Sequence, residues 1–249
     1  MNEPKTAVIV ELDDVSKEYL QGSHRVHALR GLSFKIERGE FTAICGPSGS
    51  GKTTALNLIG ALDQPTSGRV TLEDRDLSSL SRRELSHLRR DRIGFVFQAY
   101  NLLPVLTAYE NAELVLTLQG VDLDERRERV MQLLADVGLG GMESRRPSEL
   151  SGGQQQRVAI ARAIAADPAV VLADEPTANV DSETAHRLLD IMEKLNADRG
   201  VTFIFSTHDP QVFERARRLI RVVDGRIESD SVSASGEASA AAGNPGSSN

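Results

Sequence analysis

The sequence has little cysteine, no excess of basic residues and no long apolar run, and each absence excludes a class of protein. Its single cysteine, Cys45, excludes an internal disulfide, and the five scattered histidines provide no metal-ligand spacing. Because the net charge is −7 at pH 7, the chain lacks the basic surface of a nucleic-acid-binding protein. We therefore expect no nucleic acid among its partners, and we expect any metal ion to arrive with a ligand.

Hydrophobic segments are too short to cross a membrane. The longest strictly apolar run extends from Ala169 to Ala173, whereas a spanning helix needs roughly 18 residues or more. The apolar stretch near the N-terminus, Ala7 to Val10, is too short for a secretory signal. With 249 residues, 40% of them hydrophobic, the chain can still bury a sizeable core, so we expect a globular protein without a direct membrane span.

Short β-type runs alternate with helical patterns along the chain, which is typical of an α/β fold with a partly parallel sheet. The runs lie at residues 7–12, 32–36, 41–45, 69–72, 93–97, 170–173, 201–206 and 219–223. Between about residues 99 and 166 helical patterns replace the strand patterns, which predicts a helical lobe inserted between two strands. Residues 229–249 are almost all small or polar, and we expect them to form a disordered tail.

A glycine-rich segment follows the run at residues 41–45 and matches the pattern G-x-x-x-x-G-K-[ST]. A strand pattern precedes it and a helix pattern follows it, which is the context of a phosphate-binding loop. Backbone N–H groups of such a loop surround phosphate oxygens, Lys52 can reach the β- and γ-phosphates, and Thr53 can ligate Mg²⁺. The alternative is a glycine-rich turn that binds no nucleotide. The segment comprises Gly46, Pro47, Ser48, Gly49, Ser50, Gly51, Lys52, Thr53 and Thr54.

Two carboxylates follow the apolar run at residues 170–173. We expect Asp174 at the carboxyl edge of that strand, where phosphate-bound Mg²⁺ would lie. Glu175 then falls beside the attacking water, which a carboxylate can polarise as a general base. Two acidic residues before Pro176 could also simply end a strand. Together with the glycine-rich segment, however, the pair favours nucleotide hydrolysis.

A third motif, LSGGQQQR, occupies residues 150–157 and begins a helical pattern. A Ser-Gly-Gly sequence at a helix N-terminus can bind an anion, although the same residues also suit an ordinary N-cap. The residues concerned are Ser151, Gly152, Gly153 and Gln154. The three motifs, in this order, resemble those of the ATP-binding cassette (ABC) family of ATPases, and the resemblance extends over residues 10–228.

The resemblance implies a fold and further site residues. The implied fold is a P-loop NTPase core with a mixed β-sheet and an antiparallel β-subdomain, plus the inserted helical lobe, in one ATPase domain over residues 1–228. Tyr19 matches the aromatic residue that stacks on adenine, and Gln98 matches the glutamine that senses Mg²⁺ and water. His208 matches the histidine that contacts the γ-phosphate, and Asp181 matches the loop that communicates across the dimer. The implied catalytic residues are Lys52, Gln98, Glu175 and His208, and the implied metal ligands are Thr53, Gln98 and Asp174.

Cofactors and partners also follow from the resemblance. The implied cofactors are ATP and Mg²⁺, and the implied assembly is a head-to-tail dimer in which residues 151–153 of one chain close on the γ-phosphate held by the other. Such a dimer drives a separate membrane permease, so we expect a peripheral subunit at the cytoplasmic face of the inner membrane. The permease is expected to dock just after Gln98, where residues 100–106 include several apolar side chains, although these could equally pack inside the lobe.

Residues 28–34, 60–68 and 93–106 resemble the subgroup that includes the lipoprotein-releasing, macrolide-export and cell-division cassettes. This implies a subunit that drives export or transmits force across the membrane. The alternative within the family is a cassette that regulates cell-envelope or cell-division machinery without transporting a substrate. Cassettes of DNA repair carry a very long coiled coil between the P-loop and the third motif, and only the helical lobe fits there in this chain. Ribosomal cassettes occur as two per chain, which this sequence does not match.

Overall fold

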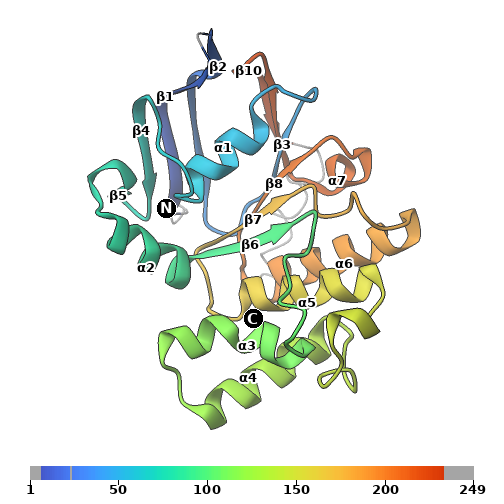
Figure 1. Cartoon of the computed structure of the whole chain (residues 1–249). Helices are drawn as coiled ribbons and strands as arrows, with labels where there is room; N and C mark the ends of the chain where they lie inside the picture. Colours follow the sequence, from blue (N-terminus) through green and yellow to red (C-terminus); the bar gives the residue numbers. More distant parts are fainter. Residues whose placement is uncertain (1–6, 23, 233–249) are drawn as a thin grey trace, which may run out of the picture.

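The computed structural model describes residues 7–22 and 24–232 and contains two sheets and an all-helical region (Figure 1). The strands are β1 (Val8–Gln21), β2 (His24–Glu37), β3 (Phe41–Cys45), β4 (Ser67–Leu72), β5 (Arg75–Asp76), β6 (Ile93–Phe97), β7 (Val170–Asp174), β8 (Phe203–Thr207), β9 (Arg218–Val223) and β10 (Arg226–Val232). The α-helices are α1 (Lys52–Ile59), α2 (Arg82–Arg92), α3 (Ala108–Gln119), α4 (Leu123–Asp136), α5 (Gly152–Ile164), α6 (Ser182–Arg199) and α7 (Pro210–Arg215). The 3-10 turns η1 (Leu77–Ser79) and η2 (Pro147–Glu149) precede α2 and α5.

The central sheet has the strand order β10-β9-β3-β8-β7-β6. Neighbouring strands from β9 to β6 are parallel, and β10 is antiparallel to β9 at the edge. Every residue of β3 and β8 is buried, because helices or the second sheet cover both faces of a parallel sheet. The carboxyl ends of β3, β6, β7 and β8 consequently meet at one edge, which is where ligands bind in open α/β sheets.

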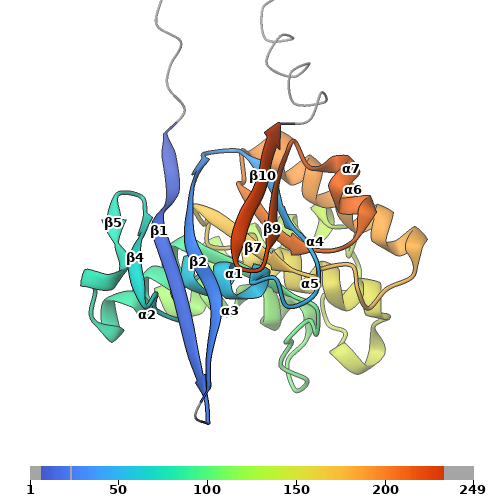
Figure 2. The ribbon, with the colours of Figure 1, turned by 90° about the horizontal axis from the view of Figure 1, so that it is seen from above.

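The second sheet is antiparallel, with the strand order β2-β1-β4-β5, and is dominated by the long hairpin of β1 and β2 (Figure 2). Helix α1 packs between this sheet and the central one. Its Leu56, Leu58 and Ile59 belong to a buried cluster that also contains Leu12 of β1 and Ile44 of β3. The helix that follows the glycine-rich loop is therefore fixed by apolar contacts with both sheets.

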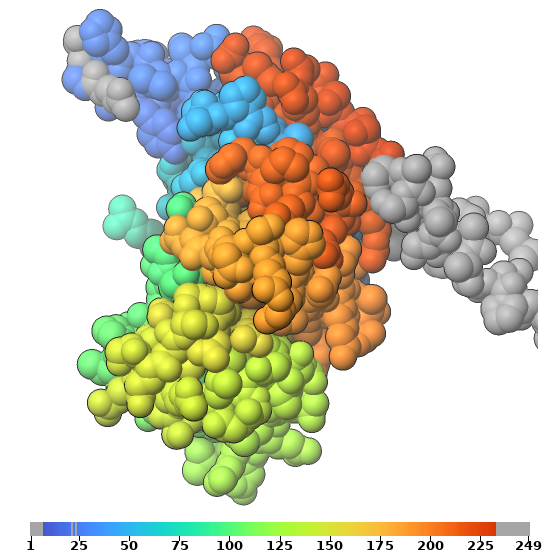
Figure 3. All heavy atoms as spheres, turned by 90° about the vertical axis from the view of Figure 1, so that its right-hand side faces the viewer, coloured from blue at the N-terminus to red at the C-terminus, as the bar shows by residue number. Residues whose placement is uncertain are grey.

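Helices α3, α4 and α5 lie between β6 and β7 in the chain and pack into one lobe. Leu116 of α3, Leu134 of α4 and Ile160 of α5 are fully buried in the cluster that joins this lobe to the central sheet. Figure 3 shows the green-to-yellow atoms of this region at one end of the molecule, with orange α6 and α7 next to them. Thr107 and Ser151 each form a capping box, which fixes where α3 and α5 begin.

The fold class inferred from the sequence is confirmed: a mixed central sheet, an antiparallel subdomain and inserted helices are all present. The predicted tail boundary is wrong by four residues, because Ser229 to Val232 pair with β9 as part of β10. Backbone pairing and the ion pair of Asp230 with Arg218 order this polar stretch. Residues 233–249, the remainder of the predicted tail, lie outside the described residues. Within the described ranges the structure has no helix long and apolar enough to cross a membrane.

Candidate functional site

The glycine-rich loop connects the end of β3 to the start of α1 and depends on glycine at two positions. Gly46 has a φ of 146°, and a Cβ there would lie 2.0 Å from the carbonyl oxygen of Val222. Gly51 has a φ of 105°, and its Cβ would lie 2.5 Å from the carbonyl oxygen of Ala28. The N-terminus of α1 has no side-chain cap and no acidic residue in its first turn. Its first backbone N–H groups and the positive end of its dipole therefore suit an anion.

Lys52 places an ammonium group inside this loop. Its Nζ donates hydrogen bonds of 2.9 Å to the carbonyl oxygens of both Gly46 and Pro47, and the residue is only 8% exposed. The loop's own backbone thus holds the charge at the start of α1, and no carboxylate within residues 7–22 and 24–232 forms an ion pair with it. Ser50 carries a buried Oγ that has no hydrogen-bond partner among the described residues.

Thr53 and Asp174 bring two oxygen ligands together at the end of β7. The hydroxyl of Thr53 donates a 3.2 Å hydrogen bond to Oδ1 of Asp174. Across residues 7–22 and 24–232, no group of three or more His, Cys, Asp and Glu residues could hold a metal ion unaided. One hydroxyl and one carboxylate fit Mg²⁺, which typically takes one or two protein carboxylates and completes its shell with phosphate and water oxygens.

Glu175 follows Asp174 and has a φ of 47°, in the left-handed region that costs a non-glycine residue energy. Its backbone N–H donates to the carbonyl oxygen of Ser206, so the neighbouring strand β8 fixes this conformation. The carboxylate accepts a 2.9 Å hydrogen bond from the Thr207 hydroxyl, and Nδ1 of His208 lies 2.6 Å from its other oxygen. This backbone conformation places the carboxylate at the ends of the strands, where it contacts Thr207 and His208.

Gln98 follows β6 and pairs with Asn179 through two hydrogen bonds. Its Nε2 donates to Oδ1 of Asn179 at 3.2 Å, and Nδ2 of Asn179 donates back to the carbonyl oxygen of Gln98 at 2.8 Å. The hydroxyl of Tyr100 donates to the carbonyl oxygen of Asn179. Asn179 thus connects the segment after β6 with the segment that leads to α6, a link that no sequence motif indicated.

Several of these groups line one cleft of about 630 Å³, and Asp174 and Asn179 are hydrogen-bonded to two of its lining residues, Thr53 and Gln98. The predicted residues that line it are Ser48, Gly49, Gly51, Lys52, Thr53, Thr54, Gln98, Glu175 and His208. Val26, His27 and Ala28 of β2 also line it, and sequence reasoning missed them. The feature that could have indicated them is the register of the β1–β2 hairpin, which pairs Tyr19 with Val26. Tyr19 is 36% exposed, and its hydroxyl donates a 2.8 Å hydrogen bond to Oδ2 of Asp63.

Residues 151–154 and Asp181 do not line this cleft. Ser151 caps α5 and accepts a hydrogen bond from the backbone of Gln154, while Asp181 caps α6. Hydrogen bonds from the hydroxyl and backbone of Thr184 lower the pKa of Asp181. A Cβ on Gly153 would lie 2.3 Å from Cγ2 of Thr184, so glycine is needed where α5 approaches α6. The prediction that these residues act on the nucleotide held by a second chain stays a prediction.

Comparisons with known proteins give a family match and several similar relatives. A family model described as "ABC transporter" matches residues 29–178. The chain is 46% identical over 231 residues to the lipoprotein-releasing system ATP-binding protein LolD of Anaeromyxobacter dehalogenans, covering 92% of this chain and 97% of that protein. It is 49% identical over 226 residues to the macrolide export ATP-binding/permease protein MacB of Hyphomonas neptunium, covering 91% of this chain but only 35% of that protein.

A solved structure is similar over nearly the same range. It is a dimeric post-hydrolysis state of the ATP-binding cassette MJ0796 from Methanocaldococcus jannaschii, bound to ADP and Pi. The two chains superpose with a TM-score of 0.83 at 43% sequence identity, over 90% of this chain and 98% of that one. The likeness thus includes the elements that carry the loop, the strand ends and the helical lobe.

Proposed function

This chain belongs to the ABC transporter family, and from that premise we propose that the cleft at the glycine-rich loop is where it binds ATP and hydrolyses it to ADP and phosphate. The observation that carries the proposal is the convergence of groups from four strand ends. Lys52 follows β3, Gln98 follows β6, Glu175 follows β7 and His208 follows β8. One space is thus surrounded by the loop, a cation, an amide, a carboxylate and an imidazole. This arrangement suits transfer of a phosphoryl group to water.

Each group has a separate task in this proposal. The loop and Lys52 hold the β- and γ-phosphates and offset their charge. Glu175 accepts a proton from the attacking water, and Thr207 and His208 hold its carboxylate in place. His208, whose side chain is largely exposed, can reach the γ-phosphate from the open side. Thr53, Asp174 and Gln98 would hold Mg²⁺, which supplies further stabilisation of negative charge on the phosphates when it is bound.

We propose that two copies assemble head to tail around two ATP molecules. Residues 151–153 do not line their own chain's cleft, yet the N-terminus of α5 that they form suits an anion. A second chain can present this helix end to the γ-phosphate, so that each site is complete only in the dimer. The dimeric form of the similar MJ0796 cassette supports this assembly. An isolated chain is expected to hydrolyse ATP slowly.

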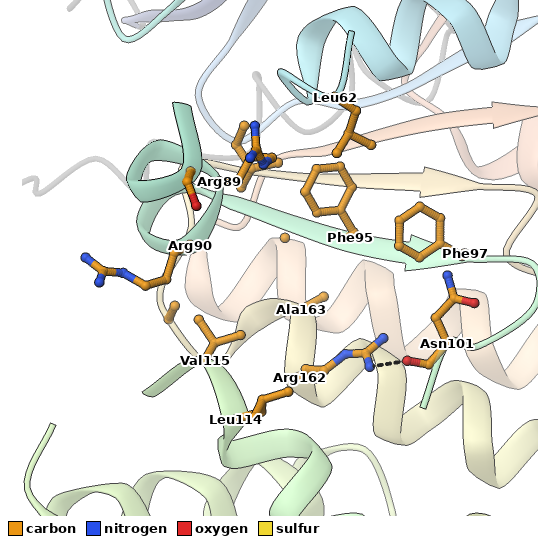
Figure 4. Close-up of a pocket in the computed structure, with 14 residues that line it drawn as sticks. Leu62, Arg89, Arg90, Phe95, Phe97, Asn101, Leu114, Val115, Arg162 and Ala163 are labelled. Carbon is orange, nitrogen blue, oxygen red and sulfur yellow. Dashed lines mark hydrogen bonds between the residues drawn. The ribbon is translucent and has the colours of Figure 1, made fainter. Parts of the chain in front are cut away.

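The permease is proposed to dock in a groove of about 450 Å³ between the central sheet and the helical lobe (Figure 4). Phe95 and Phe97 of β6 form one wall, and Leu114 and Val115 of α3 lie opposite them. The segment after Gln98 contributes Asn101 to the same groove; it leaves Leu103 and Val105 exposed, whereas Leu102 packs against the buried cluster. Exposed apolar groups beside a groove are typical of a protein interface.

The relatives favour a subunit of the export or force-transmitting type. This chain covers almost all of LolD, whose name refers to lipoprotein release, and about a third of MacB, whose name refers to macrolide export and includes a permease. We propose that the chain drives a permease of that kind from the cytoplasmic face of the membrane. In this proposal the permease determines the cargo.

A capture experiment tests the assignment. Tagged Glu175→Gln protein, held in Mg-ATP with detergent-solubilised membranes of the source cell, is expected to recover a permease that mass spectrometry identifies. The same protein in Mg-ADP is the matched control, because ADP lacks the γ-phosphate on which the second chain closes in the proposed dimer. Members of the subgroup that this chain resembles work with permeases that have few spanning helices and a large outer domain. Recovery of such a permease therefore supports the export type, and recovery of a many-helix permease contradicts it. Recovery of soluble partners alone contradicts the membrane role.

A further inference from the structure

Tyr19 is held at its hydroxyl end by a side chain that is far away in the sequence. Its hydroxyl donates to Oδ2 of Asp63, and Oδ1 of the same carboxylate accepts a 2.6 Å hydrogen bond from Nζ of Lys17. Lys17 also donates to the carbonyl oxygen of Gln64 at 2.7 Å, and its side chain is only 12% exposed. The three side chains therefore form one connected set between β1 and the turn after α1.

The turn that carries Asp63 is itself fixed to α1. The backbone N–H groups of Leu62 and Asp63 both donate to the carbonyl oxygen of Asn57, and Ala61 adopts a φ of 52°. Helix α1 begins at Lys52, so one short helix connects the phosphate-binding loop at its start with Asp63 just beyond its end. The position of the Tyr19 ring is consequently tied to the helix that begins at the glycine-rich loop.

Lys17 also restricts the face of the ring that remains available. Its Nζ lies 4.9 Å from the centroid of the Tyr19 ring, within cation–π range. A planar base can stack only on a free aromatic face, so the ammonium leaves the opposite face for it. On the neighbouring strand the register partner of Tyr19 is Val26, which lines the cleft. The ring thus stands beside the cleft in a fixed orientation.

We propose that Asp63 and Lys17 are positioning residues for the adenine base. Asp63 holds the hydroxyl group of Tyr19, and Lys17 covers one face of its ring. The inference rests on the proposed ATP site and specifies which residues fix the side chain on which the base would stack. Neither residue touches the phosphates, so their effect falls on nucleotide affinity rather than on the chemical step. Removing the Tyr19–Asp63 hydrogen bond is expected to weaken ATP binding about three- to tenfold, the size of one ordinary hydrogen bond.

Four variants test the proposal by steady-state kinetics with MgATP and by calorimetric titration with ATP and with tripolyphosphate, which has no base. Asp63→Ala and Tyr19→Phe remove the hydrogen bond from either side. Each should raise KM for ATP three- to tenfold, leave kcat within twofold and leave tripolyphosphate affinity unchanged. The combined variant should be no worse than Asp63→Ala alone, because both changes remove the same bond. Asp198→Ala, an exposed carboxylate on α6, is the matched control and should change nothing.

Tyr19→Ala separates this proposal from the one on which it rests. If Tyr19→Ala leaves the KM for ATP unchanged, the ring binds no base and the assignment of that side of the site fails with it. If Tyr19→Ala raises KM while Tyr19→Phe and Asp63→Ala do not, the ring binds the base without help and only the positioning proposal is overturned. An equal loss of tripolyphosphate affinity in Asp63→Ala would show that Asp63 acts through α1, which also overturns it.

Discussion

Replacing Glu175 with glutamine isolates the chemical step from nucleotide binding. The substitution keeps the size of the side chain and one acceptor oxygen, but the amide can no longer take a proton from water. Thr207 and His208 both contact the carboxylate in the parent, and the amide oxygen can accept from only one of them. The variant therefore loses the proposed general base and one hydrogen bond, while the loop that holds the phosphates stays intact.

The expected magnitudes differ widely for the two losses. A positioned general base contributes about 10²–10⁴-fold to the rate, which corresponds to roughly 3–5 kcal/mol of activation free energy. One lost hydrogen bond costs about 1 kcal/mol of folding free energy, which is small against the roughly 5–15 kcal/mol of a typical domain. The variant should thus be folded, bind ATP like the parent and turn over at least about a hundredfold more slowly.

Phosphate release measures turnover, and light scattering in Mg-ATP measures the mass of the particle. We expect a trapped dimer, because the closed assembly forms around ATP and can no longer hydrolyse it. Glu125→Gln, an exposed glutamate on α4, is the matched control and should keep the parental rate. A kcat within twofold of the parent would refute the role of Glu175, and a particle that stays monomeric in ATP would refute the composite site.

Three other substitutions have defined outcomes. Lys52→Ala removes a charged donor from the phosphates and should weaken ATP binding about 10–100-fold by fluorescent-nucleotide titration, and unchanged affinity would contradict the loop assignment. Gly153→Ala places a Cβ 2.3 Å from Cγ2 of Thr184 and should lower stability by about 1–3 kcal/mol in urea. Adding Thr184→Ser removes that methyl group and should restore most of the loss, whereas no restoration would contradict the steric cause. Glu73 is bonded to Arg92 and Arg38, and the Arg92 hydrogen bond lowers its pKa. Because the folded-state pKa is depressed, its stabilisation is present above about pH 4.5 and disappears as the pH falls through the folded value. The stability difference between parent and Glu73→Gln should therefore shrink from pH 6 to pH 3, and a constant difference would contradict this linkage.

Strands β3 and β6 could be predicted from the sequence because their side chains are mostly apolar and form recognisable short runs. The expected bounds of β3 and β6 match the observed ones, since each is a short, mostly apolar run; β3 is buried throughout, and β6 is buried except at Phe95 and Phe97. The β1–β2 hairpin is much longer than expected, because exposed polar residues near its tip give no alternating pattern. Strand β10 was not predicted, for a similar reason. Its residues are mostly exposed, and pairing with β9 rather than burial orders it.

Some residues of the candidate site could likewise be predicted from local sequence, and others could not because they depend on tertiary packing. The loop, the carboxylate pair and the Ser-Gly-Gly motif are contiguous in the sequence, so their spacing alone identifies them. Val26, Asp63 and Asn179 reach the site from separate elements, and each depends on a strand register or a turn conformation. No local pattern encodes such a contact, because it results from the packing of elements far apart in the chain.

The segment after Gln98 is held from two sides, and this explains how the nucleotide cleft and the groove can be coupled. Arg162, on the same helix that Ser151 begins, donates to the carbonyl oxygen of Asn101 at 2.6 Å (Figure 4). It also donates to the carbonyl oxygen of Tyr100 at 2.9 Å. Both of those residues have positive φ values, 50° and 56°, so the segment keeps a conformation that these hydrogen bonds stabilise. In the proposed dimer, a displacement of the N-terminus of α5 toward the second chain would act on Arg162, which lies on the same helix, and so on the wall of the groove. A partner in the proposed docking groove and a nucleotide at the proposed site beside Gln98 would therefore act on the same short segment of backbone.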